Sequence, residues 1–210
     1  MSIAAPPGRR TQPAPGNGGR YHWTVDRLYR ATAAGVFDEP NRLELIDGDL
    51  REKEKVNPPH AIATVRTARR LRALFEPSRC VREEKPIHLD FDGEPVPDVL
   101  VADGSDEDYA TNHPVPRSTR LIVEVADTSV TYDTGDKAIL YAQAGIADYW
   151  VLLVNPRELL VYRNPTPDGY DGEPQRLHEG DTVSPLFAPD VTIAVANLLP
   201  PRSRPEPDAA

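Results

Sequence analysis

Apolar and polar positions recur with two different periods along the central part of the chain, and this pattern predicts both helices and strands. Apolar residues return every three to four positions where a helix is expected and every second position where a strand is expected. Thr24 is placed to cap the first helix, and the pair Asp47-Gly48 is typical of a tight hairpin turn. In chain order, the predicted elements are a helix over 24–35, a hairpin over 42–55, a helix over 58–75, strands over 79–90, 95–103 and 120–129, a helix over 132–145, strands over 148–155 and 159–164, and a hairpin that ends near 199. Their order predicts a mixed α/β (α+β) fold.

Composition indicates one domain with a tail at each end. The chain has 210 residues, of which 39% are hydrophobic and 23 are proline, which suits a single globular domain. Residues 1–20 and 201–210 are rich in proline and lack apolar periodicity, so both are predicted to be disordered. The folded domain is therefore expected over residues 21–200.

Targeting signals and cysteines bear on the compartment. No apolar run reaches the roughly 18 residues of a membrane span, and the N-terminal residues contain no apolar signal core. The single Cys80 permits no internal disulfide, as is common in a reducing compartment. We expect a cytoplasmic protein that has no membrane partner.

The charge balance narrows the classes of function. The formal net charge of -9 at pH 7 argues against a protein that coats nucleic acid through a general basic surface. This net charge is compatible with an enzyme that binds phosphates through metal ions. The helix over 58–75 differs from the rest, because it carries Arg66, Arg69, Arg70 and Arg72. These arginines either form an ordinary solvated helix face or contact phosphate groups, and the charge pattern alone favours the solvated face.

An acid interrupts the most apolar predicted strand, residues 120–129. Because side chains alternate along a strand, Glu124 shares a face with Ile122, and Val123 and Val125 lie on the other face. A carboxylate buried on such a strand is unfavourable unless a partner compensates its charge. The partner is either a basic side chain or a bound cation.

The preceding predicted strand carries a second acid. Asp98 stands at the start of its apolar run, on the same face as Leu100. Two acids on adjacent strands of one sheet repel each other unless a cation lies between them. Carboxylate oxygens suit Mg2+ or Mn2+, with water completing the coordination shell. The pattern therefore leaves two hypotheses open: the acids bind a divalent metal ion, or they form structural ion pairs.

Lys137 is the basic residue best placed to reach these acids. It shares a helical stripe with Leu140, Tyr141 and Ala144, which are otherwise apolar positions. If this stripe packs on the sheet, the Lys137 ammonium points toward the end of the Glu124 strand. There it either forms a simple ion pair with Glu124 or orients a water molecule and stabilises charge on a phosphate.

These segments resemble a known family. The stretch "PDVLVA", followed by "LIVEVADTSVTYDTGDKAILYAQAGIADYWVL", together with "RLELIDGDL", resembles the PD-(D/E)XK nuclease superfamily and, within it, the Uma-type putative restriction endonuclease family. The resemblance covers residues 21–199 and implies a restriction-endonuclease-like fold, with a central mixed β-sheet flanked by helices. The superfamily's motif lysine would stand two residues after Glu124, where this chain has Ala126.

The resemblance implies roles for particular residues. Asp98 and Glu124 match the metal ligands, and Lys137 matches the catalytic lysine, which in the Uma-type family lies on the following helix. Glu44 matches a further acid of the family, either as a metal ligand or as a hairpin surface residue. His60, at the start of the Arg-bearing helix, is a candidate phosphate or water contact, although a helix cap or surface role is more common for such a residue.

The function implied is Mg2+-dependent (or Mn2+-dependent) hydrolysis of DNA phosphodiester bonds, with Arg66 and Arg70 as candidate DNA contacts. Cleavage of both strands favours two active sites and hence a homodimer. A second hypothesis is an inert nuclease-fold module that binds nucleic acid or regulates another protein, which Ala126 and the low positive charge favour. A third is hydrolysis of a small phosphate ester.

Overall fold

The computed structural model describes residues 21–53 and 56–202. The predicted disordered tails fall outside these residues, apart from positions 201 and 202. The chain forms two compact units, one made of Met1–Lys53 and Leu89–Pro95 and the other of Glu54–His88 and Val96–Ala210. The single domain expected over residues 21–200 stays a prediction.

The first unit contains the first predicted helix and the first predicted hairpin. The Thr24 hydroxyl caps the helix by accepting a hydrogen bond from the backbone N–H of Arg27 at 3.3 Å. Asp47 and Gly48 both have positive φ, at 48° and 77°, as the predicted two-residue turn requires. The elements of this unit are α1 (Val25–Ala33), a 3-10 turn (Pro40–Arg42), β1 (Leu43–Ile46) and β2 (Asp49–Glu52).

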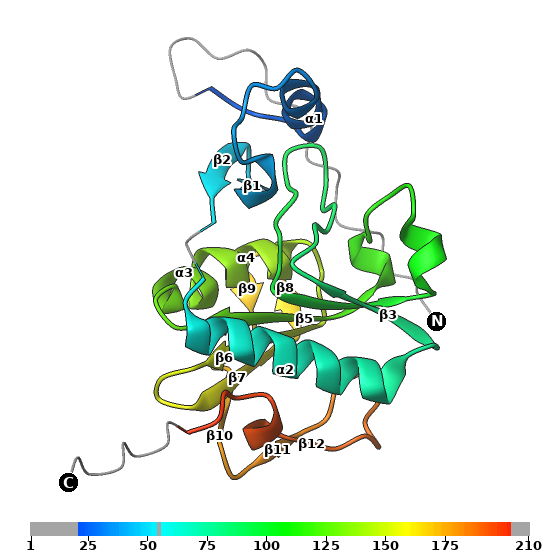
Figure 1. The fold of residues 1–210 in the computed structure, drawn as a ribbon. Helices are drawn as coiled ribbons and strands as arrows, with labels where there is room; N and C mark the ends of the chain where they lie inside the picture. Colours follow the sequence, from blue (N-terminus) through cyan, green and yellow to red (C-terminus); the bar gives the residue numbers. More distant parts are fainter. Residues whose placement is uncertain (1–20, 54–55, 203–210) are drawn as a thin grey trace, which may run out of the picture. The chain divides into compact units, whose positions relative to one another are not determined.

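The second unit is built on a six-stranded sheet with the strand order β10-β7-β6-β5-β4-β3. Strands β5 and β6 are parallel and the other neighbours antiparallel, which confirms the predicted mixed sheet flanked by helices (Figure 1). Its helices and sheet strands are α2 (Pro58–Phe75), β3 (Arg79–Glu83), β4 (Val99–Asp103), β5 (Thr119–Ala126), α3 (Val130–Thr134), α4 (Asp136–Gln143), β6 (Asp148–Leu153), β7 (Glu158–Arg163) and β10 (Gln175–His178). Short pieces complete it, namely the 3-10 turns Asp106–Tyr109, Pro116–Ser118 and Val195–Asn197, and the strands β8 (Pro165–Thr166), β9 (Gly169–Tyr170), β11 (Thr182–Val183) and β12 (Ile193–Ala194).

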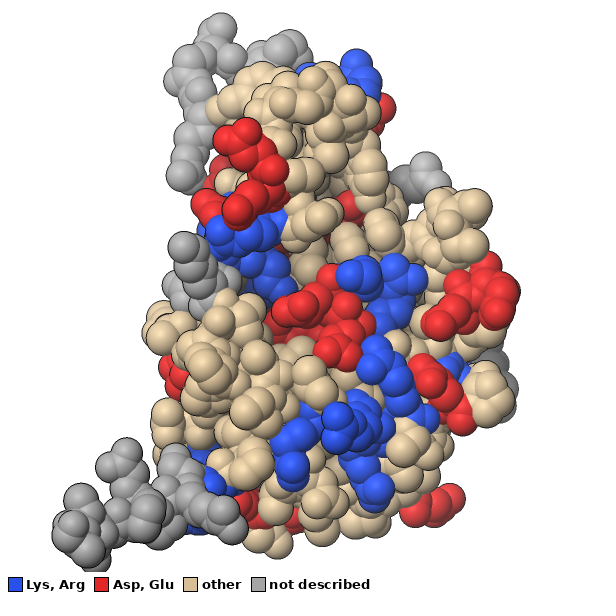
Figure 2. Space-filling model, viewed as in Figure 1, with Lys and Arg blue, Asp and Glu red and all other residues tan. Residues whose placement is uncertain are grey.

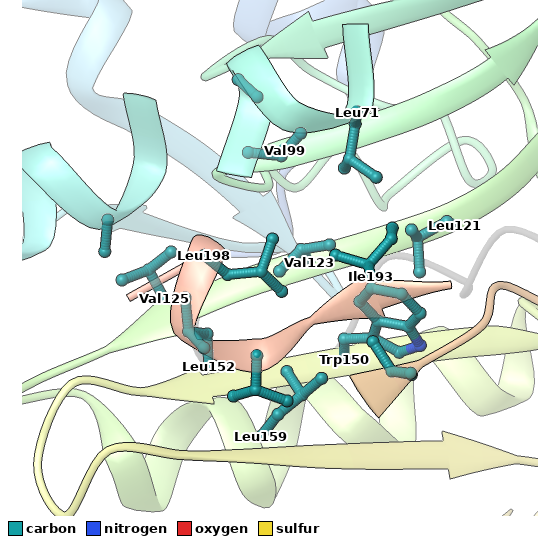
Figure 3. Close-up of a cluster of buried hydrophobic side chains, with 14 of the residues drawn as sticks. Leu71, Val99, Leu121, Val123, Val125, Trp150, Leu152, Leu159, Ile193 and Leu198 are labelled. Carbon is teal, nitrogen blue, oxygen red and sulfur yellow. The ribbon is translucent and has the colours of Figure 1, made fainter. Parts of the chain in front are cut away.

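The two faces of this sheet are covered differently. One face packs against α2 and the C-terminal segment, and its core includes Leu71 of α2, Val123 of β5 and Trp150 of β6 (Figure 3). Figure 1 shows α3 and α4 on the opposite side of β5 from α2. Because residues alternate along β5, Glu124 points to the α4 side, as the sequence predicts.

The helix predicted over 132–145 is wrong in detail, because the structure has two short helices, α3 and α4, that meet at Gly135. Gly135 has φ -110° and ψ -94°, which is not a helical conformation. A Cβ at this position would lie 2.7 Å from the Thr131 carbonyl oxygen, so the close turn needs glycine. The first of these helices also begins earlier than predicted, because Ser129 is the N-cap of α3. None of the helices in the described part of the chain has the length and apolar character needed to cross a membrane.

Candidate active site

Glu124 is the centre of a buried polar cluster between β5 and α4. Its residue is only 1% exposed. The Glu124 Oε1 atom accepts hydrogen bonds from the Lys137 ammonium at 3.0 Å and from the Tyr141 hydroxyl at 2.8 Å. Its Oε2 atom accepts the backbone N–H of Asp98 at 3.3 Å. The charge of Glu124 is thus compensated where it is buried.

Asp98 lies beside Glu124 because of the strand register. Val99 of β4 pairs with Val123 of β5, and continuing this antiparallel register by one residue sets Asp98 opposite Glu124. The Asp98 Oδ2 atom accepts the backbone N–H of Val125 at 2.8 Å. Asp98, just before β4, and Glu124 of β5 are both buried and lie next to each other at one end of the β4-β5 pair, as their spacing in the sequence predicts.

Lys137 supplies positive charge to this cluster. Its residue is 4% exposed, and its ammonium lies 3.9 Å from a carboxylate oxygen of Asp133 in addition to its contact with Glu124. The ammonium also lies 5.5 Å from the ring centroid of Tyr132, at cation–π distance. One ammonium thus faces two carboxylates, and all three residues are buried.

Asp133 and Tyr141 also belong to the cluster. Asp133 is buried and accepts a hydrogen bond from the Ser129 hydroxyl. Both residues lie four positions from Lys137 in the sequence, which is the signal that could have placed them beside it. Burial, together with the charges of Glu124 and Asp133, raises the pKa of Tyr149 well above its usual value, so its hydroxyl stays protonated. That hydroxyl donates to the Asp133 carbonyl oxygen at 2.7 Å.

His60 is brought to the same cluster from the other face of the sheet. Its Nε2 atom lies 3.3 Å from Asp98 Oδ2, so it is not the surface residue that its position at a helix start favoured. Asn57 caps α2 by accepting the His60 backbone N–H at 3.1 Å. The Asn57 side chain also donates to Asp127, just after β5, at 2.6 Å. The start of α2 is therefore tied to the end of β5, and this holds His60 beside Asp98.

Comparisons with known proteins identify the family. The sequence matches the Uma2 family, described as "Putative restriction endonuclease", over residues 25–196. The chain belongs to this family. Membership confirms the resemblance seen in the sequence and supports a nuclease function.

The fold of this Uma2 protein is similar to that of a solved structure from Anabaena variabilis ATCC 29413, described as "a putative nuclease belonging to DUF820". The two share 18% sequence identity, with a TM-score of 0.62, over 84% of this chain and 97% of that chain. At this identity the likeness shows the fold alone. A comparison with curated proteins gives no match.

In this Uma2 protein the ammonium reaches the acids from a helix. Ala126, two residues after Glu124, is buried and apolar, so it cannot take the place of the superfamily's motif lysine. The chain departs from the short motif but still sets a lysine against its strand acid, through Lys137 of α4.

Glu44 belongs to the first unit and is described apart from the cluster. It lies in β1 opposite Arg51 of β2, and the residue is 3% exposed. The reading of Glu44 as a hairpin surface residue is therefore wrong. Its role as a metal ligand stays a prediction.

The arginines of α2 do not share one role. Arg66 donates to the Ala196 carbonyl oxygen at 3.2 Å, and Arg72 pairs with Glu83 at 2.9 Å. Arg70 forms no ion pair or hydrogen bond within the described residues. The contact of Arg66 and Arg70 with a substrate stays a prediction.

The donors at the cluster suit a hard divalent cation. Asp98 and Glu124 supply carboxylate oxygens from neighbouring strands, and Mg2+ is commonly held by one or two carboxylates plus water. Within residues 21–53 and 56–202, no three or more His, Cys, Asp or Glu side chains form a recognisable metal-binding group. The fit therefore rests on the chemistry of the two adjacent acids.

Proposed function

We propose that this Uma2 protein is an endonuclease that hydrolyses DNA phosphodiester bonds and depends on Mg2+ or Mn2+. The observation that carries the proposal is the contact between two buried acids, Glu124 of β5 and Asp98 just before β4. The Asp98 backbone N–H donates to Glu124 Oε2 at 3.3 Å, and the Lys137 ammonium lies 3.0 Å from Glu124 Oε1. A fold needs no such cluster of like charges for its stability, and titratable groups gathered in this way are typical of functional sites. Family membership supports the nuclease class.

Asp98 and Glu124 would hold the cation. When bound, a divalent cation polarises a phosphate oxygen and lowers the pKa of a coordinated water. Lys137 would orient the attacking water and offset the negative charge that develops on the phosphate. Tyr141, through its hydrogen bond to Glu124 Oε1 at 2.8 Å, would fix the direction of that carboxylate.

A second candidate function is the inert nuclease-fold module. Lys137 and Tyr141 already compensate Glu124, and the Val125 backbone N–H donates to Asp98. Such contacts are also those of a purely structural cluster. The two functions differ in whether a divalent ion changes the protein's DNA cleavage and its thermal stability.

Cleavage of supercoiled plasmid separates these functions. We expect nicking or linearisation with Mg2+ or Mn2+, none with EDTA, and a loss of cleavage in Asp98→Asn, Glu124→Gln and Lys137→Met. The matched control is Asp148→Asn, because Asp148 is a buried acid of the same sheet that lies outside the cluster.

Thermal unfolding adds a measurement that does not depend on activity. A cation that binds the folded protein at 100 times its Kd stabilises it by about 2.7 kcal/mol. We expect Mg2+ or Mn2+ to raise the Tm of the native protein and of Asp148→Asn, but not that of Asp98→Asn. Cleavage that survives in all three site variants would exclude the proposed site, and DNA binding without cleavage or a metal-dependent Tm would support the inert module.

A further inference from the structure

The outer face of α2 holds arginines that form no ion pair with an acid among residues 21–53 and 56–202. Elsewhere in the described residues, arginines commonly pair with acids, as Arg30 does with Asp26 at 2.8 Å and Arg79 with Asp103 at 3.2 Å. By contrast, Arg69 and Arg70 form no ion pair or hydrogen bond within residues 21–53 and 56–202. The Nε atom of Arg70 is buried without a hydrogen-bond partner in this part of the chain.

The sequence of α2 gathers this charge on one side of the helix. The 18 residues of α2 include four arginines and no Asp or Glu, although the whole chain has a net charge of -9. The buried side of the helix is formed by small and apolar residues such as Ala68 and Leu71. Figure 2 shows basic side chains gathered over α2. We call Arg66, Arg69 and Arg70 the α2 basic face.

The geometry of the α2 basic face matches the spacing of charges on duplex DNA. Residues 66 and 70 are separated by about 6 Å along a helix that rises 1.5 Å per residue. One strand of duplex DNA carries a phosphate about every 3.4 Å along its axis, so the face spans about two phosphates. Because a guanidinium presents several N–H donors in one plane, arginine is well suited to phosphate oxygens.

The same helix leads from this face to the candidate active site. His60, in the first turn of α2, lies 3.3 Å from Asp98, and Arg70 follows about 15 Å further along the helix. On a DNA strand that lies along α2, the phosphates bound by the arginines would thus be about 15 Å from the bond that is cut.

We propose that the α2 basic face binds the phosphate backbone of duplex DNA and holds the substrate without taking part in the chemistry. This inference rests on the proposed function, because it names a contact surface for the same substrate. Arg69 and Arg70 are positioning residues, since neither touches Asp98, Glu124 or Lys137 in the described structure. Ile62 and Val65 are 45% and 43% exposed on the same helix and provide an apolar margin to the face.

The test measures binding of the full chain to a fluorescein-labelled DNA duplex by anisotropy, in EDTA, over a series of salt concentrations. The variants are Arg69→Ala/Arg70→Ala and the charge-preserving Arg69→Lys/Arg70→Lys. The matched control is Arg117→Ala, because Arg117 is an exposed arginine outside α2 that has no ion pair or hydrogen bond among the described residues. Circular dichroism checks that each variant is folded.

We expect the double alanine variant to bind about 100-fold more weakly at low salt, since it loses two charge-assisted contacts that are each worth about 1.5 kcal/mol or more. Its slope of log affinity against log salt should become shallower by about two, one for each lost phosphate contact. The lysine variant should keep most of the slope, and the Arg117→Ala control should match the native protein. In plasmid cleavage, the double alanine variant should raise KM and leave kcat unchanged.

An unchanged salt slope in the double alanine variant would overturn the inference, as would tighter binding of single-stranded RNA than of the duplex. Self-association that is lost in the double alanine variant, with no DNA binding, would also overturn it and would assign the face to a second copy of the chain. If the native protein cuts DNA and the variant cuts equally at low substrate concentration, the inference fails but the proposed function stands. Salt-dependent binding that is lost in the variant, without cleavage under any metal, would support the inference and contradict the nuclease.

Discussion

Two buried acids of the same sheet, Asp148 and Glu124, differ in what surrounds them. Asp148 of β6 is 0% exposed, and its carboxylate accepts hydrogen bonds from the Trp150 indole at 2.9 Å, Arg163 at 3.2 Å and the Leu186 backbone N–H at 2.8 Å. No second acid of the described residues is paired with it. The three donors come from different parts of the chain, and the Asp148 carboxylate links these parts.

Glu124, by contrast, lies beside another acid, Asp98, whose backbone N–H donates to it at 3.3 Å, and it shares the Lys137 ammonium with Asp133. Burial alone is common to both regions, so burial does not distinguish a site from a structural contact. The distinguishing feature is the gathering of like charges, which costs stability in the absence of a cation. Asp148 therefore serves as the structural reference for the Glu124 cluster.

The largest difference is expected in catalysis. Asp98→Asn and Glu124→Gln keep the shape of the side chain but remove a metal-binding charge. Each should lower plasmid cleavage by about 1000-fold, equivalent to about 4 kcal/mol in the activation barrier. Asp148→Asn, measured per folded molecule, should cleave at the native rate. If both site variants lost less than about tenfold in cleavage, the Glu124 cluster would not differ from Asp148 in catalysis.

The next largest effect is expected from Lys137→Met, measured by urea unfolding. Removing the ammonium leaves Glu124 and Asp133 buried without their shared cation. Breaking a buried ion pair in this way costs about 3–5 kcal/mol. Mg2+ should restore part of this stability if the acids hold it. A stability equal to that of the native protein would show that Lys137 does not compensate the cluster.

A smaller loss of stability, with a defined pH dependence, is expected for Asp148→Asn. The asparagine NH2 would face the Leu186 N–H, so about 1–3 kcal/mol should be lost. Burial raises the pKa of the Asp148 carboxyl, and hydrogen bonds from Leu186, Arg163 and Trp150 oppose part of the rise.

Because the folded-state pKa is raised, the contribution of this shift to stability is complete below the unfolded pKa, about 4, and is lost as the pH rises through the folded pKa. The difference in unfolding free energy between the native protein and Asp148→Asn should therefore shrink as the pH rises through this window. A difference that grows with pH would contradict the raised pKa.

The smallest effect is expected from Tyr141→Phe, compared with Tyr170→Phe. Each change removes one buried hydroxyl bond, to Glu124 at 2.8 Å and to the Ile146 carbonyl oxygen at 2.8 Å respectively. Both should lose about 1 kcal/mol of stability in chemical denaturation. Only Tyr141→Phe should also slow cleavage, because only Tyr141 orients a proposed metal ligand. Equal cleavage by the two variants would limit Tyr141 to a structural role.

Much of the local structure could be predicted from the sequence, because its signals act over a few residues. Thr24 caps α1, and Asp47-Gly48 forms the hairpin turn, since capping and turn chemistry depend on neighbours in the chain. Asp98 and Glu124 could each be assigned to one face of its predicted strand by the two-residue period. The break at Gly135 could not, because it depends on a close approach to the Thr131 carbonyl oxygen.

The sequence by itself determined most of the order of the elements, the family, and the fact that Asp98, Glu124 and Lys137 come together, since these follow from periodicity and motif spacing. Only the tertiary structure decided that Asp133 is buried beside Lys137 and that His60 approaches Asp98 from the helix on the opposite face of the sheet. Such contacts depend on strand register and on the tie between Asn57 and Asp127. Residues that are far apart in the chain come into contact through packing, and the local pattern of side chains does not show which of them will do so.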